Sequence, residues 1–207
     1  MAAFNRRYAP VTELARRWMA GFSGRIEQIR CDFRRIGRTG EDFSTTAIHG
    51  LDTVAFLAGA PMEELEIERQ PIPGGENLRL RAEHANGVRS TLQFLPDSDV
   101  QRECYTVVTR AEQLELHFPC GSGNGKIRLL RGNRVQEFTP PGETHFFRGG
   151  YFAEDNRFLA ALAAPCLRKS LPELFEMTAA SVGAAEAIRT GASRWENPVG
   201  TLSAPLR

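Results

Sequence analysis

The stretch DFSTTAIHGLDTVAFLAG, residues 42–59, carries one histidine between two other polar residues at helical spacing. Thr45, His49 and Asp52 stand at i, i+4 and i+7, so a helix would bring their side chains to one face. An imidazole with an ordinary pKa of about 6.5 can accept a proton near neutral pH. His49 is therefore the residue of this stretch around which chemistry would lie.

The same stretch has the start and stop signals of a helix. Asp42 is a favourable N-cap residue, Gly59 suits a left-handed turn after the last helical residue, and Pro61 prevents continuation. An apolar stripe at spacings of three and four runs beside the polar one, and consists of Ile48, Leu51, Ala55 and Ala58. The pattern predicts a helix at the edge of a core, with His49 next to the buried face.

No other group of residues has metal-ligand or redox spacing. The remaining histidines are scattered, and the four cysteines, which form no CxxC pair, are Cys31, Cys104, Cys120 and Cys166. We predict no metal site, no disulfide framework and a reducing cytoplasmic location. The Gly-rich run 121–126 is followed by a strand-like segment and lacks the Ser or Thr of a phosphate loop, so a hairpin loop is the favoured interpretation.

Composition describes an ordinary globular chain of 207 residues, with 42% hydrophobic and 25% charged residues and a formal net charge of +1. Residues 1–40 are rich in arginine, but they contain no nucleic-acid-binding motif and the whole chain is nearly neutral. No run reaches the length of a membrane span, and the N-terminus lacks the apolar core of a signal peptide. We therefore expect neither nucleic-acid binding nor membrane insertion.

Periodicity predicts helices and strands in segregated blocks. The expected helices cover 10–22, 42–59, 150–164 and 171–190. The expected strands cover 25–36 with one irregularity, 62–70, 77–85, 88–95, 101–110, 112–118, 126–131 and 134–139. Asn86-Gly87 and Gly132-Asn133 are hairpin signals, which indicate antiparallel pairing. The fold class is α+β, with a large, mostly antiparallel sheet and helices packed on one of its faces.

Three segments, in this order, resemble the C-terminal two-thirds of the Gfo/Idh/MocA oxidoreductases, the glucose-fructose oxidoreductase and inositol dehydrogenase group. They are FNRRYAP at 4–10, IHGLD at 48–52 and AASVGAAEAIRTG at 179–191. The resemblance implies three parts. Residues 1–24 would be the remnant of a junction with a Rossmann domain (a strand end plus a helix), 25–191 an α+β substrate and oligomerisation domain, and 192–207 a C-terminal arm.

The family resemblance also implies roles for single residues. His49 would be the general base that takes the proton of a sugar or cyclitol hydroxyl, with Thr45 and Asp52 beside it. Asp52 could fix the tautomer of His49 or bond a neighbouring backbone group, and Asn5, Arg6 and Tyr8 would face the substrate or the cofactor. Thr45 occupies a position where the family often has aspartate. Because threonine cannot balance an imidazolium charge, we expect a less basic His49.

A complete enzyme of this kind would use NAD or NADP, but the family's Gly-rich nucleotide turn and its lysine have no counterpart in this sequence. We therefore expect no cofactor to be bound by this chain alone, and a Rossmann domain that is either supplied by a separate subunit or cut off from this sequence. The family's sheets often pack face to face, which implies a homodimer or higher oligomer. Two hypotheses remain open: the substrate half of a dehydrogenase, and a non-enzymatic sugar-binding or assembly module. If bulky apolar side chains filled the surroundings of His49, the enzymatic hypothesis would fail.

Overall fold

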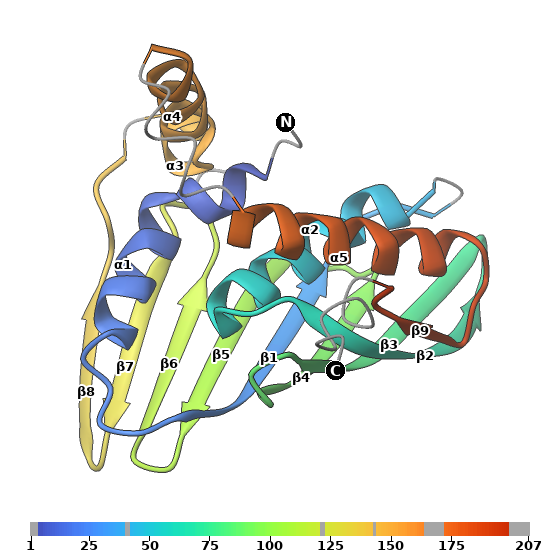
Figure 1. The fold of residues 1–207 in the computed structure, drawn as a ribbon, viewed down its shortest axis with the longest axis horizontal. Coiled ribbons are helices and arrows are strands. Elements are labelled where there is room, and N and C mark those ends of the chain that lie inside the picture. Colours follow the sequence, from blue (N-terminus) through green and yellow to red (C-terminus); the bar gives the residue numbers. More distant parts are fainter. Residues whose placement is uncertain (1–3, 40–41, 121–122, 143, 164–171, 199–207) are drawn as a thin grey trace, which may run out of the picture.

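The structure, a computed structural model, describes residues 4–39, 42–120, 123–142, 144–163 and 172–198. Helices lie over one broad sheet (Figure 1). The helices are the 3-10 helix η1 (Asn5–Tyr8), α1 (Pro10–Met19), α2 (Ser44–Ala58), α3 (His145–Arg148), α4 (Tyr151–Ala163) and α5 (Pro172–Arg189). The strands are β1 (Ile26–Arg34), β2 (Met62–Ile72), β3 (Gly75–His84), β4 (Arg89–Leu95), β5 (Arg102–Thr109), β6 (Glu112–His117), β7 (Lys126–Arg131), β8 (Arg134–Phe138) and β9 (Arg194–Glu196).

The nine strands form one sheet in the order β8-β7-β6-β5-β1-β4-β3-β2-β9. All neighbours are antiparallel except β1 and β4, which pair in parallel because the chain crosses over through α2, β2 and β3 before returning to β1. The predicted irregularity in the first strand is a register shift between Ile26 and Gln28. The α+β class and the mostly antiparallel sheet are confirmed.

Turn chemistry explains the two predicted hairpins. Gly87 and Gly132 both have positive φ, at 75° and 57°, which glycine adopts without a Cβ penalty. The first joins β3 to β4 and the second joins β7 to β8. The Gly-rich segment 121–126 lies between the antiparallel strands β6 and β7, as the hairpin interpretation requires, although 121–122 lie outside the described residues.

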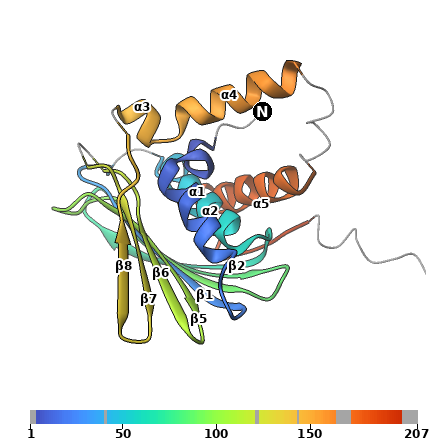
Figure 2. The same ribbon diagram turned by 90° about the vertical axis from the view of Figure 1, so that its left-hand side faces the viewer.

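The helices cover one face of the sheet only, and α4 lies furthest from it (Figure 2). Alternate residues of each central strand point toward the helices and form the core, with Phe33 and Phe94 fully buried under α2. Gly50 lets α2 approach these rings closely, since a Cβ there would stand 2.7 Å from Cε1 of Phe94. The sheet thereby holds α2, the helix of His49, at a fixed depth.

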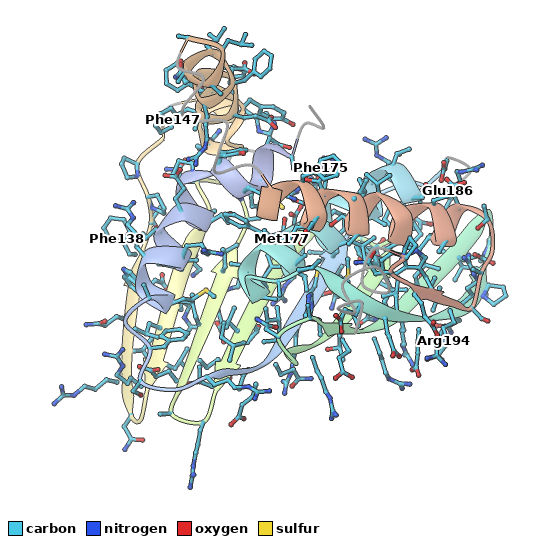
Figure 3. All side chains as sticks on the ribbon, viewed as in Figure 1. Phe138, Phe147, Phe175, Met177, Glu186 and Arg194 are labelled. Carbon is cyan, nitrogen blue, oxygen red and sulfur yellow. The ribbon has the colours of Figure 1, made fainter. Side chains whose placement is uncertain are left out.

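The opposite face of the sheet is open and carries alternating cations and anions. Among its ion pairs are Arg81 with Glu66, Arg194 with Glu64, and Arg128 with Glu115. Figure 3 labels Arg194 on β9 at one edge of this face. This face is therefore charged and is not a broad apolar surface, so its exposure does not by itself indicate a partner.

Several boundaries differ from the sequence-based expectation. The helix expected over 10–22 ends at Met19, and residues 5–8 form a 3-10 helix where the end of a strand was expected. The interpretation of 192–207 as an arm is wrong for 194–196, which form β9 and pair with β2 at the sheet edge; residues 199–207 lie outside the described part. In the part of the chain that the structure describes, no helix is long and apolar enough to cross a membrane.

Candidate active site around His49

The helix that carries His49 starts one residue later than its cap signal suggested. Phe43 is the N-cap, and Oδ1 of Asp42 accepts a hydrogen bond from the Ser44 backbone N–H at 3.0 Å. The carboxylate therefore still satisfies a free N–H of the first turn. At the other end Gly59 adopts the left-handed conformation with φ 74°, as predicted.

His49 lies half-buried on α2, and its Nδ1 is inaccessible to solvent without a hydrogen-bond partner among the described residues. Burial lowers the pKa of His49 to about 4; the guanidiniums of Arg6 and Arg35 act in the same direction, and Glu103 opposes them. The expectation of a less basic His49 is confirmed in direction. Desolvation and two cations account for it, and they keep the imidazole neutral at pH 7.

Thr45 is exposed, and its hydroxyl donates to the carbonyl oxygen of Asp42 at 2.9 Å. This bond closes the first turn of α2. The Thr45 hydroxyl is therefore engaged within the first turn of its own helix and is not bonded to the ring of His49.

Asp52 is fully buried and is paired with Arg7 instead of with His49. Nε of Arg7 donates to Oδ2 of Asp52 at 2.8 Å, Nη2 donates to Oδ1, and the same Nη2 reaches the hydroxyl of Thr178 on α5 at 3.1 Å. A bidentate pair of this kind holds its partners in one geometry. The pair joins η1, α2 and α5, so the expectation that Asp52 fixes the tautomer of His49 is not met.

The three residues expected to face the substrate separate into two groups. Arg6 turns toward the sheet, where Nε and Nη2 donate to the carboxylate of Glu103 at 2.7 and 3.2 Å. Asn5 is buried and donates to the Gly149 carbonyl at 2.7 Å, while Tyr8 lies under the Arg157 guanidinium of α4, 5.8 Å from its ring centroid. Of the three, Arg6 alone is brought toward His49; Asn5 and Tyr8 fix the position of α4.

Sequence reasoning missed the carboxylate at the centre of this site. Glu103 on β5 accepts hydrogen bonds from Arg6, from Nη2 of Arg35 at 2.5 Å and from the hydroxyl of Tyr105 at 2.7 Å. Burial raises its pKa, but the two guanidiniums and the Tyr105 bond outweigh burial and lower the pKa to about 2. A signal was present: in the strand RECYTVVT, Glu103 occupies the same inward alternation as Tyr105 and Val107.

The resulting site consists of a neutral imidazole beside a charged cluster. We call Arg6, Arg35, Glu103 and Tyr105 the Glu103 cluster. Aromatic rings of the core flank the cluster: Arg35 stacks on Phe33 at 3.7 Å, and Arg6 lies 5.1 Å from the ring centroid of Phe118. Charged side chains therefore lie near His49, and the aromatic rings of Phe33 and Phe118 lie beside them.

The Gly-rich run does not have the geometry of a dinucleotide-binding turn. The Gly-rich run leads into β7 and not into a helix whose N-terminus could bind pyrophosphate. Among the same residues, no group of three or more His, Cys, Asp or Glu side chains is arranged to bind a metal ion. What the site can do with its own side chains is accept a hydroxyl proton at His49 and bind polar groups at the Glu103 cluster.

Solved dehydrogenases share this fold. A dehydrogenase (MviM) from Clostridium difficile matches with a TM-score of 0.71 and 14% identity, over 93% of this chain and 62% of its own. A dehydrogenase from Chromobacterium violaceum matches with a TM-score of 0.72 and 18% identity, over 91% and 60%. Levoglucosan dehydrogenase, solved in complex with NADH and levoglucosan, matches with a TM-score of 0.72 and 13% identity, over 96% and 66%.

The chain therefore spans less than two thirds of the length of these dehydrogenases. No protein-family model matches the sequence, and no curated protein matches it significantly. At identities below 25% the likeness concerns the fold, and at that level it confirms the resemblance read from the sequence.

Proposed function

We propose that this chain is the substrate-binding and oligomerisation half of a Gfo/Idh/MocA-type, NAD(P)-dependent oxidoreductase that acts on a hydroxyl of a sugar or cyclitol. The observation that carries the proposal is the position of His49. A neutral imidazole, whose Nδ1 has no hydrogen-bond partner among the described residues, lies on the helix that contains the IHGLD segment. It stands beside a charged cluster in a fold shared with dehydrogenases.

In this proposal the residues have distinct tasks. His49 accepts the proton of the substrate hydroxyl, and Arg6 contributes to substrate binding. Asp52 and Arg7 act indirectly, because their pair fixes η1 against α2 and so positions Arg6 relative to His49. Thr45 maintains the first turn of the same helix.

The nicotinamide cofactor is assigned to a separate nucleotide-binding domain, because the Gly-rich run of this chain leads into a strand and not into a helix that could bind pyrophosphate. A calorimetric titration of the 207-residue chain with NADH and with NADPH is expected to give no binding heat. Saturable binding of either dinucleotide would contradict this division of roles.

A docking surface for that domain is proposed on α3 and α4. These helices expose a run of aromatic side chains, of which Phe146 stacks on Tyr151 at 5.9 Å; the others are Phe147, Phe152 and Phe158. Figure 3 shows Phe147 next to α3, well above the sheet. The Asn5–Gly149 bond ties this surface to η1, the segment that resembles the domain junction. An exposed apolar patch of this kind commonly marks an interface.

Amide hydrogen exchange tests the docking surface. Only Glu154 of α4 is buried, so α4 should exchange much faster than α2 when the chain is alone. Protection of α4 equal to that of α2 would mean that the helix is stable without a partner, and would remove the argument for docking.

One observation favours the second candidate, a sugar-binding module without catalysis. A pKa of about 4 makes His49 a weak base, because burial disfavours the imidazolium and two guanidiniums repel it. The two candidates differ in the sugar-bound state. A His49 pKa that rises toward neutrality when sugar binds supports proton transfer, whereas a pKa that stays near 4 supports binding alone.

The sugar site itself is tested by saturation-transfer NMR with a panel of neutral and acidic sugars and cyclitols. We expect transfer to at least one class of ligand with the wild-type chain, and loss of that transfer in His49→Gln. His117→Gln, on the opposite face of the sheet, is the matched control and should retain it. No transfer to any member of the panel, or equal transfer in His49→Gln, would contradict the proposal.

A further inference from the structure

The Glu103 cluster contains more positive than negative charge. Arg6 reaches Glu103 from η1 and Arg35 reaches it from the end of β1, so both guanidiniums converge on one carboxylate. The side chains of Arg6, Arg35 and Glu103 are 12%, 11% and 1% exposed. One positive charge is therefore left over in a largely buried site.

The neighbouring groups do not neutralise it. Arg7 is already paired with Asp52, and the Tyr105 phenol, whose pKa burial raises well above its ordinary value, is neutral at pH 7. His49 is neutral as well. Within the described residues Nη1 of Arg6 has no hydrogen-bond partner, although Nε and Nη2 are both bound to Glu103. A buried charge without a counter-charge is costly, so a ligand that supplies one would be favoured.

The excess charge lies close to His49. The Phe33 ring contacts both parts of the site: Arg35 and Arg6 lie 3.7 and 5.9 Å from its centroid, and a Cβ at Gly50, next to His49 on α2, would stand 3.3 Å from its Cδ2. An anion bound to the free edge of Arg6 would therefore lie within the same small site as the imidazole. The lowered pKa of His49, to which both guanidiniums contribute, agrees with this proximity.

We propose that the substrate is an anionic sugar, whose carboxylate or phosphate group pairs with Arg6 and Arg35 while one of its hydroxyls faces His49. This inference rests on the proposed function and narrows its substrate class. Guanidinium groups suit both anions, because the planar fork donates two parallel hydrogen bonds to carboxylate or phosphate oxygens. Glu103 then acts as a positioning residue that orients both guanidiniums.

The bound anion would also change the basicity of His49. It would supply the negative charge that the cluster lacks and weaken the repulsion between Arg6, Arg35 and an imidazolium. Only an anionic substrate would then raise the pKa of the base toward the working pH. A cluster that merely ties η1, β1 and β5 together would leave the pKa of His49 unchanged by such ligands.

Calorimetric titrations of the 207-residue chain at pH 7 test the inference. The ligands are D-glucuronate, glucose 6-phosphate, D-glucose and inorganic phosphate. We expect D-glucuronate or glucose 6-phosphate to bind at least about tenfold more tightly than D-glucose, as a charge-assisted contact implies. The same ligand should raise the pKa of His49 in NMR titrations.

Variants of two adjacent arginines provide the control. Arg35→Gln should abolish the preference for the anionic sugar, and Arg35→Lys, which keeps the charge, should retain part of it. Arg34→Gln should leave the preference intact, because Arg34 is paired with Asp32 on the open face of the sheet. Circular dichroism of each variant establishes that the fold is retained.

The outcomes separate this inference from the proposed function. Equal affinity for D-glucose and the two anionic sugars, or an unchanged preference in Arg35→Gln, would overturn the inference and leave the sugar site in place. Inorganic phosphate binding as tightly as glucose 6-phosphate would overturn the assignment of a sugar as the carrier of the charge. Binding of none of the four ligands would contradict both.

Discussion

Burial shifts the pKa of single ionisable residues in this molecule. The change in stability with pH that follows from such a shift can be measured. His84 is fully buried, with Nδ1 3.2 Å from the Ala60 carbonyl oxygen and Nε2 2.8 Å from the Ser90 hydroxyl. Burial lowers its pKa to about 4, as it does for His49. Both rings are neutral when folded at pH 7, but in the unfolded chain they would take up protons below pH 6.5.

The free energy of unfolding should therefore fall as the pH drops from 6.5 toward 4. The unfolded state binds the extra protons in this window, so each ring costs up to about 1.4 kcal/mol per pH unit. Urea unfolding at pH 7 and pH 5 measures the difference. His84→Asn should reduce the slope, and His145→Asn, at an exposed position, should not. Equal slopes for wild type and His84→Asn would contradict the account.

The Arg7–Asp52 pair gives the second prediction at this scale. Asp52→Ala leaves the Arg7 guanidinium buried without its counter-charge, which should lower the free energy of unfolding by about 3–5 kcal/mol. Chemical denaturation measures the loss. Glu186→Gln, which breaks the exposed pair with Arg189, is the control and should have no measurable effect. An Asp52→Ala protein as stable as wild type would show that the pair does not hold η1 and α2 together.

Among the elements, α2 depends on a close approach to the sheet at Gly50. Gly50→Ala should lower the free energy of unfolding by about 1–3 kcal/mol, because the new methyl group would overlap the Phe94 ring. This outweighs the better helix propensity of alanine, which is worth about 1 kcal/mol. In a Phe94→Leu background, which makes room, Gly50→Ala should cost less. An equal cost in both backgrounds would contradict a direct clash.

The elements also show which parts of the fold sequence patterns can predict. Alternation and turn residues predicted the strands from β2 to β8, and cap residues predicted α2, because these signals act between neighbours in the chain. The strand β9 was missed, since three residues at the sheet edge are stabilised by pairing with β2, more than a hundred residues earlier. The parallel pairing of β1 with β4 likewise joins strands that are far apart in the sequence, so local patterns do not predict it.

Only some residues of the candidate site could be predicted from the sequence. His49 was found because its helix carries a local motif, and Arg6 because of a family resemblance. Glu103 and Arg35 were missed because their significance comes from convergence across β1, β5 and η1. Asp52 was found at the right spacing, but its ion pair with Arg7 was missed, since the pair joins segments 45 residues apart.

For the whole molecule, we expect a dimer through the open face of the sheet, with a strong dependence on salt. Cations and anions alternate on this face, for example Arg81 and Glu66, so a second copy related by a two-fold axis could pair them. Sedimentation velocity at low and at 1 M salt should show the dimer dissociating, with a dissociation constant raised about tenfold or more.

A charge reversal on that face should act like salt. Glu66→Arg is expected to weaken the dimer, and Glu186→Arg, on the helical side, is expected to leave it unchanged. A chain that stays monomeric at low salt, or a dimer that responds to neither salt nor Glu66→Arg, would contradict assembly through this face.

The most direct test of the account is the NMR spectrum of the histidine rings during titration of the 207-residue chain with anionic sugars. The central claim is that His49 lies in a sugar-binding site. The account predicts that the His49 resonances shift in a saturable way while those of His84, buried elsewhere in the core, stay unchanged. A ligand that binds without shifting the His49 resonances would contradict it.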